Sequence, residues 1–228
     1  MRRKAGLVFL LIITIVLSFI ATRYYLGFHY LGRYKALRAE APSIERSFPA
    51  LEAALKEALG FSNNPVLFQE LGRLYSERAL AELKYGQPEN WDLYLDLAQD
   101  AFARVIRINP TDGLAYYDLG RTWMFYNNPL LTYAGKGRFY YRKALEFKPM
   151  NESLNLNILF TFLTQWNGLS DEDKTFTFRT LRKMADDVGD FASRLRRLWM
   201  ENVKDEAALK EILAEDQALW QKVKGNFK

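Results

Sequence analysis

Residues 68–75 read FQELGRLY and residues 116–123 read YYDLGRTW, and these two octapeptides decide the fold. Each begins and ends with an aromatic residue and carries Leu-Gly at its fourth and fifth positions. The apolar positions at i, i+3 and i+7 lie on one face of an α-helix. A glycine inside a helix costs about 1 kcal/mol relative to alanine, so each glycine needs a packing reason. The octapeptides therefore predict two amphipathic helices, each with a glycine beside its apolar face.

A second set of residues follows each octapeptide at a repeated spacing of 4, 3 and 5 residues. The first set is Ala98, Phe102, Val105 and Pro110, and the second set is Gly137, Tyr141, Ala144 and Pro149. The combined pattern resembles the tetratricopeptide repeat, in which an aromatic residue, Leu-Gly and Tyr precede Ala, Phe, Ala and a closing Pro. The resemblance implies an all-α fold, a right-handed solenoid of helical hairpins that presents a surface to a partner. It implies a binding scaffold rather than an enzyme.

The resemblance assigns interhelix packing to the repeated positions, which lie in a core of residues 65–150 within a repeat region of residues 49–168. They are Phe68, Leu71, Gly72, Tyr75, Ala98, Phe102, Pro110, Tyr116, Leu119, Gly120, Trp123, Tyr141, Ala144 and Pro149. Weaker copies flank them. Residues 49–64 form a degenerate opening repeat, and a third repeat after Pro149 loses the Leu-Gly pair, as expected where a stack ends.

Both repeats are longer than the 34-residue standard. The first has 14 extra residues between Tyr75 and Ala98, with the turn signal Gly86-Gln87-Pro88 near their middle. Because 14 residues are two heptads, each helix can gain about two turns and keep its packing face. We therefore expect long helices near 65–85 and 90–108. The second repeat has five extra residues between Asn127 and Gly137, which predict a longer loop.

Residues 5–22 carry no charge over 18 residues, which as a helix reach about 27 Å, close to the thickness of a bilayer core. The run is too long for a typical signal peptide, and Phe19 fits a cleavage site poorly, so we expect an uncleaved transmembrane anchor. The membrane-interface residues are Arg2, Arg3, Lys4, Arg23, Tyr24 and Tyr25. The basic cluster at the N-terminus favours a cytoplasmic tail, which in a bacterium places the repeats in the periplasm.

Residues 23–48 form an aromatic juxtamembrane segment and a linker. The stretch from Tyr24 to Tyr34 predicts an interfacial belt that continues the anchor helix, or alternatively a docking strip for a membrane subunit. Pro42 and Pro49 predict a bend over residues 41–48, with Pro49 in the first turn of the next helix.

Residues 169–228 predict a helical cap on the open end of the stack. Ser170 precedes an acidic helix start, one helix is expected over residues 191–202, and a single final helix is expected from Asp205. Arg194, Arg196 and Arg197 form a basic cluster, which is interpreted as a solvated face with salt bridges or as a site for an acidic partner.

Charge and composition narrow the functions. Seven of the 32 basic residues precede the first acid, Glu40, so the rest of the chain has 25 basic and 27 acidic residues, which disfavours nucleic acid as a partner. With no cysteine and only His29, a thiolate site, a catalytic triad and a multi-histidine metal site are excluded within this chain. We expect no cofactor and no metal. A carboxylate enzyme using Asp92, Asp96 and Asp100 is the alternative of another class, without a recognisable nucleophile and base.

In the family, the first helix of each repeat lines a groove for the partner. The corresponding groove positions are Gln69, Arg73, Ser76, Glu77, Tyr117, Arg121, Met124, Phe125, Leu156 and Phe160. They predict a groove that is polar at one end and aromatic at the other, unless long helices or the cap bury the aromatic end. The leading hypothesis is a membrane-anchored scaffold whose protein partners belong to a bacterial envelope complex for secretion, pilus assembly or polysaccharide handling. The alternative is a cytosol-facing anchored adaptor.

Overall fold

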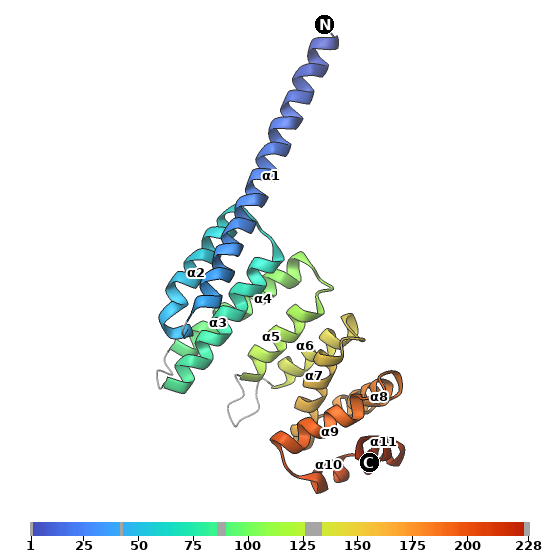
Figure 1. Cartoon of the computed structure of the whole chain (residues 1–228). Helices are drawn as coiled ribbons and strands as arrows, with labels where there is room; N and C mark the ends of the chain where they lie inside the picture. The colour runs from blue at the N-terminus through green and yellow to red at the C-terminus, as the bar shows by residue number, and fades with distance from the viewer. Residues whose placement is uncertain (1, 42, 86–89, 126–133, 226–228) are drawn as a thin grey trace.

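The computed structural model describes residues 2–41, 43–85, 90–125 and 134–225, and within these ranges every regular element is helical (Figure 1). The helices are α1 (Arg2–Glu40), α2 (Ile44–Phe61), α3 (Pro65–Tyr85), α4 (Trp91–Ile108), α5 (Gly113–Phe125), α6 (Ala134–Phe147), α7 (Glu152–Thr164), the short 3-10 helix η2 (Trp166–Gly168), α8 (Asp171–Asp187), α9 (Phe191–Asn202), α10 (Glu206–Ile212) and α11 (Gln217–Lys224). The all-α prediction is confirmed.

Consecutive helices pack as antiparallel pairs, and the pairs stack into a solenoid that ends in the C-terminal helices (Figure 1). The pairs are α1 with α2, α3 with α4, α5 with α6, and α7 with α8, and at the C-terminal end α9 packs against both α7 and α11. The long helices expected at 65–85 and 90–108 are confirmed as α3 and α4. Most of the longer loop expected between Asn127 and Gly137 lies outside the described residues, and Gly137 itself lies inside α6.

The two repeated glycines mark the closest approach within their hairpins. A Cβ placed on Gly72 would lie 2.6 Å from the Phe102 ring of α4, and a Cβ placed on Gly120 would lie 2.7 Å from the Tyr141 ring of α6. Phe102 is fully buried. The missing side chain therefore makes room for the aromatic residue of the second helix, and the same contact recurs in both repeats.

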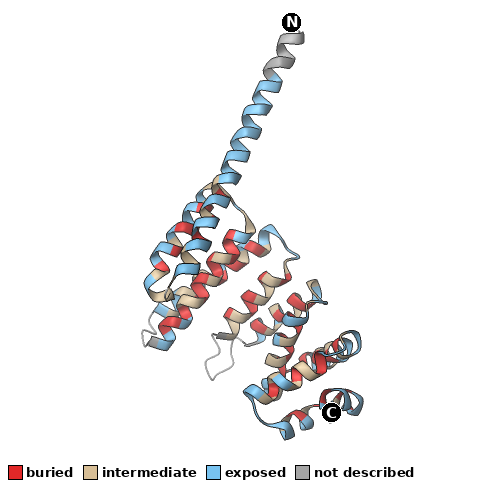
Figure 2. Cartoon of the chain, in the orientation of Figure 1, coloured by how far each residue is buried: buried red, intermediate tan, exposed pale blue. Residues whose placement is uncertain are grey.

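Helix α1 is continuous from the apolar N-terminal run into the first hairpin (Figure 2). Its outer half is exposed, while Leu31 and Tyr34 in its inner half are buried against α2 and α3. At the junction, the Arg23 side chain donates hydrogen bonds to the carbonyls of Gly60 and Phe61, at 2.9 and 3.0 Å, at the C-terminal end of α2. The segment interpreted as an interfacial belt is thus largely the first helix of the opening hairpin.

The expected break between helices is confirmed between Glu40 and Ile44, but its extent to residue 48 is wrong, because α2 already begins at Ile44. Pro49 lies inside this helix and not in its first turn. A proline inside a helix leaves the carbonyl four residues earlier without its usual donor. Here the Arg78 side chain of α3 donates to that carbonyl, on Glu45, at 3.4 Å. A tertiary contact therefore allows the helix to run through the proline. Pro42 lies outside the described residues.

The third repeat, which forms the α7–α8 hairpin, is more complete than the sequence indicates. Its second helix, α8, buries Thr177, Leu181 and Met184 at the repeated spacing, and Gly189 stands in the position of the closing proline. The expected start of α8 is confirmed, because the Asp173 backbone N–H donates to the Ser170 hydroxyl at 3.1 Å. The single final helix expected from Asp205 is wrong: Asp205 caps α10, and Asp216 caps a separate α11.

Candidate functional site

The first helices of successive hairpins are joined side by side by polar contacts. Arg38 of α1 pairs with Glu77 of α3. Further along, the Arg73 guanidinium of α3 donates to the Asp118 carboxylate of α5 at 3.0 Å, and the Gln69 amide donates to the same oxygen at 2.5 Å. These charge-assisted bonds connect neighbouring repeats, so this surface, which we call the first-helix face, carries a ladder of paired charges.

Asp118 is the central acceptor of this ladder, and sequence reasoning missed it. Its side chain is only 5% exposed, and its partner Arg73 is 45 residues away in the preceding repeat. No local spacing signals such a pair. The structure therefore gives Gln69, Arg73 and Glu77 a structural role in holding the repeats together, in addition to the groove role that the sequence predicts.

Tyr117 continues the first-helix face toward α7. Its ring stacks on Tyr141 with centroids 5.6 Å apart, and burial raises the pKa of its hydroxyl. The positive charge of Arg121 opposes that rise in pKa. Ser76 is fully buried, and its hydroxyl donates to the Gly72 carbonyl at 2.9 Å. The side chain therefore bonds to its own helix and is not exposed on the predicted groove.

The aromatic end of the predicted groove is largely covered. Met124 packs into the space over Gly137, where a Cβ would lie 2.5 Å from its sulfur. Leu156 and Phe160 are half-buried against the C-terminal helices, with the Phe160 ring 6.3 Å from Trp199 in an edge-on arrangement. Of the two alternatives that the sequence leaves open, this packing favours a covered aromatic end, because interhelix packing and the cap occupy these side chains. The Phe125 side chain lies outside the described part of the chain.

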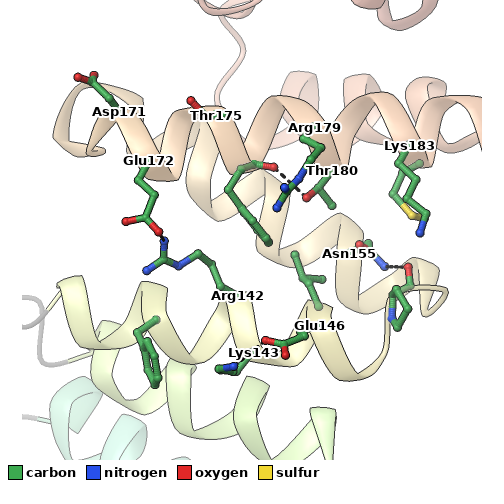
Figure 3. Close-up of a pocket in the computed structure, with 15 residues that line it drawn as sticks. Arg142, Lys143, Glu146, Asn155, Asp171, Glu172, Thr175, Arg179, Thr180 and Lys183 are labelled. Atoms are coloured by element: carbon green, nitrogen blue, oxygen red, sulfur yellow. Dashed lines mark hydrogen bonds and ion pairs between the residues drawn. The ribbon is translucent and has the colours of Figure 1, made fainter.

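A pocket of about 1060 Å³ opens between α6 and α8, two second helices of successive hairpins (Figure 3). Asn155 of α7 contributes to its lining, and its amide donates to the Pro149 and Asn151 carbonyls. Arg142 of α6 bridges the opening to Glu172 of α8 at 2.5 Å. Sequence reasoning did not find this pocket, because α8 was not assigned to the repeats.

A second cavity of about 840 Å³ lies between the turn that follows α7 and the helices α9 and α10. Trp166, Trp199 and Ile212 contribute apolar surface to it. It is the space left between the last repeat and the cap.

The basic cluster of α9 is mostly paired. Arg194 contacts Glu152 and Arg196 contacts Glu206, each at 2.7 Å. Arg197 is exposed. This arrangement favours the interpretation of a solvated face with salt bridges.

The N-terminal half of α1 has the length and composition of a membrane-spanning helix. Its most apolar 18-residue window has a mean hydropathy of 2.0, and the apolar side chains from Phe9 to Ile20 are exposed. Tyr24 and Tyr25 are exposed beside this half, whereas the side chains of Arg2, Arg3 and Lys4 lie outside the described residues.

Acidic residues are spread rather than gathered. Within the described ranges, no group of His, Asp and Glu side chains is arranged to hold a metal ion. Asp92, Asp96 and Asp100 are exposed along α4. Their arrangement is that of a solvated helix face.

Comparison with known proteins supports the fold and leaves the function open. No protein-family model matches the chain, and no curated protein matches it in sequence. A solved structure of the human IFIT1 dimer with PPP-AAAA superposes with a TM-score of 0.57 over 87% of this chain, at 17% sequence identity. The match spans 46% of the IFIT1 chain. At this identity the likeness shows a helical-repeat fold of the tetratricopeptide-like type and no more.

Proposed function

We propose that this chain is a tetratricopeptide-type, non-enzymatic scaffold, anchored by a single transmembrane helix, that holds a protein partner close to a membrane. In this proposal the chain is an accessory or assembly subunit of a bacterial envelope complex, such as a secretion, pilus or polysaccharide machine. The partner binds along the first-helix face, near Arg73, Tyr117 and Arg121.

The continuity of α1 carries the proposal. One 39-residue helix, about 58 Å long, contains both the exposed apolar run and the first helix of the solenoid. Exposure of an apolar run of this length to water is unfavourable. A bilayer core accommodates it, because a helix satisfies its own backbone hydrogen bonds there. Because the same helix buries Leu31 and Tyr34 in the repeat core, the solenoid begins directly at the membrane surface.

The charge of the first-helix face favours a protein over a nucleic acid. The IFIT1 structure contains PPP-AAAA, so a related fold can accompany a phosphate-rich ligand. Here the acidic residues Glu70, Glu77 and Asp118 stand among the basic residues of the same face. Mixed charge suits exchange of ion pairs with a protein and disfavours a polyphosphate backbone.

Orientation follows from the N-terminal basic cluster. Three basic residues beside the apolar run favour a cytoplasmic N-terminus and repeats in the periplasm. Protease added to intact spheroplasts is expected to digest the repeats in this orientation. Protection of the repeats until the membrane is opened would instead support the cytosol-facing adaptor.

Photo-crosslinking in native membranes tests the binding face. A benzophenone side chain replaces Tyr117 in one variant and the exposed Ala53 of α2 in a control. We expect Tyr117 to yield a discrete product containing a protein of an envelope complex, and Ala53 to yield none. Equal labelling at both positions, or no product at Tyr117, contradicts the proposed face.

A further inference from the structure

The pocket between α6 and α8 is lined mainly by these two second helices, and Asn155 is its one lining residue from the first helix α7. Its volume of about 1060 Å³ is at the upper end of the range of small-molecule sites and is large enough for a short peptide segment. The close-up shows α8 above and α6 below, with Arg179 and Lys183 directed from α8 toward the opening between the helices (Figure 3).

The charges around this pocket are unevenly paired. On α6, Arg142 is neutralised by Glu172 and Lys143 by Glu146, at 2.5 and 2.7 Å. On α8, no ion pair involves Arg179 or Lys183 among the residues that the structure describes. Asp171, the remaining acid of the lining, is eight residues before Arg179, or about 12 Å along the helix. One end of the pocket is therefore positive.

Apolar side chains also line the pocket. Phe139 of α6 is 46% exposed, although large aromatic residues usually bury most of their surface. Phe176 lies beneath the Arg179 guanidinium, 5.7 Å from it, and Leu145 and Met184 complete the apolar lining. The pocket thus offers apolar contact surface and a pair of cations one helical turn apart.

We infer that this pocket binds a short acidic segment of a protein partner, with an Asp, Glu or C-terminal carboxylate on Arg179 and Lys183 and an aromatic or aliphatic side chain elsewhere in the segment against Phe139. An arginine binds a carboxylate through two parallel hydrogen bonds, and a buried apolar anchor supplies the remaining contact. A phosphate dianion fits less well, since Glu146 of α6 and Glu172 of α8 also line the pocket. The inference rests on the proposed scaffold function but uses a surface separate from the first-helix face.

A random dodecapeptide library displayed on phage provides the test, with the full chain embedded in nanodiscs as the target. Variant R179E/K183E reverses the two pocket cations, and variant R197E/K210E makes the same change in charge at exposed positions of α9 and α10. We expect enriched peptides to pair an acidic residue with an aromatic or aliphatic one. Their affinity should fall about tenfold or more in R179E/K183E and stay within about twofold in the control.

Three further measurements distinguish peptide binding in the pocket from loss of folding, from binding elsewhere and from nonspecific binding of anions. Far-UV circular dichroism and thermal unfolding must match between the two double variants, so that lost binding is not lost folding. A benzophenone side chain at Thr175, which lines the pocket, must label the selected peptide. Inorganic phosphate at 10 mM or anionic lipid in the nanodisc must not displace it beyond the effect of equal ionic strength.

The inference is overturned if the selected peptides lack acidic residues, if both double variants bind equally, or if phosphate or anionic lipid displaces the peptide. It is also overturned if the library yields no binder. The first-helix proposal is judged separately by the Tyr117 crosslink. A product at Tyr117 without peptide binding at Thr175 would reject only the pocket, and the reverse result would reject only the first-helix face.

Discussion

Replacing Gly72 with alanine tests the contact that we assign to the repeated Leu-Gly motif. The new Cβ would lie 2.6 to 2.8 Å from three atoms of the Phe102 ring, and Phe102 is fully buried in the core of the α3–α4 hairpin. Alanine improves helix propensity by about 1 kcal/mol. Overpacking of a buried site costs about 1–3 kcal/mol. The net expectation is a loss of about 0–2 kcal/mol in the free energy of unfolding.

Gly32→Ala is the matched control. Gly32 also lies inside a helix, but a Cβ there meets no atom within 4 Å. This variant should gain about 0.5–1 kcal/mol from the helix propensity alone. The two substitutions are chemically identical, so the difference between them, about 1–3 kcal/mol, isolates the packing cost.

Urea unfolding of the full chain in detergent micelles, followed by far-UV circular dichroism, measures both variants. The double variant Gly72→Ala/Phe102→Leu should lose less stability than the sum of its single changes, because the smaller leucine leaves room for the new Cβ at position 72. If Gly72→Ala is stabilised as much as Gly32→Ala, the glycine is not there to admit Phe102, and our account of the repeat motif is wrong.

Three other predictions concern the ladder, the junction and the tyrosines. Asp118→Ala should lower the free energy of unfolding by about 1–3 kcal/mol, since Arg73 and Gln69 lose a buried acceptor. Replacing the exposed Asp100 with alanine should change this free energy by less than about 0.5 kcal/mol. Equal urea midpoints for the two variants would refute the ladder of paired charges. Leu31→Ala should lower the free energy of unfolding by about 2–5 kcal/mol in the same assay, whereas Leu17→Ala, at an exposed position, should leave it almost unchanged. An equal effect of both substitutions would show that the part of α1 around Leu31 is not part of the core. Burial and a 2.7 Å hydrogen bond to Glu52 raise the pKa of Tyr75 above its ordinary 10.0, so the unfolded chain releases this proton first and stability is lost as the pH rises above about 10. Tyr75→Phe should flatten the decline of the urea midpoint between pH 9 and 11, and parallel profiles for the two proteins would contradict this assignment.

The repeat helices could be predicted because their determinants are local. The Leu-Gly motifs, the 14-residue insertion and the turn near Gly86 together place α3 and α4 within a residue of their observed ends. The start of α2 could not be predicted in the same way. Pro49 indicates a helix start when only neighbours in sequence are considered, and the donor that satisfies the Glu45 carbonyl comes from Arg78, 33 residues later.

The exposure of the groove positions and the place of the pocket depend even more on contacts between repeats. The groove positions follow from helix register, but their exposure depends on Met124 filling the space over Gly137 and on α9 covering Phe160. The α6–α8 pocket required α8 to be recognised as a second helix. Its packing residues Thr177, Leu181 and Met184 have the repeated spacing without the usual residue types, so the pattern was hidden.

In the proposed anchored state, the unbroken course of α1 sets the azimuth and height of the whole solenoid relative to the bilayer. In an α-helix each residue adds about 1.5 Å of rise and about 100° of rotation. One residue inserted between the apolar run and Arg23 would therefore swing every binding surface by more than a quarter turn around the membrane normal while lifting it only slightly. The number of residues in this helix, and not only their chemistry, thus determines which neighbours in a membrane complex the repeats can reach.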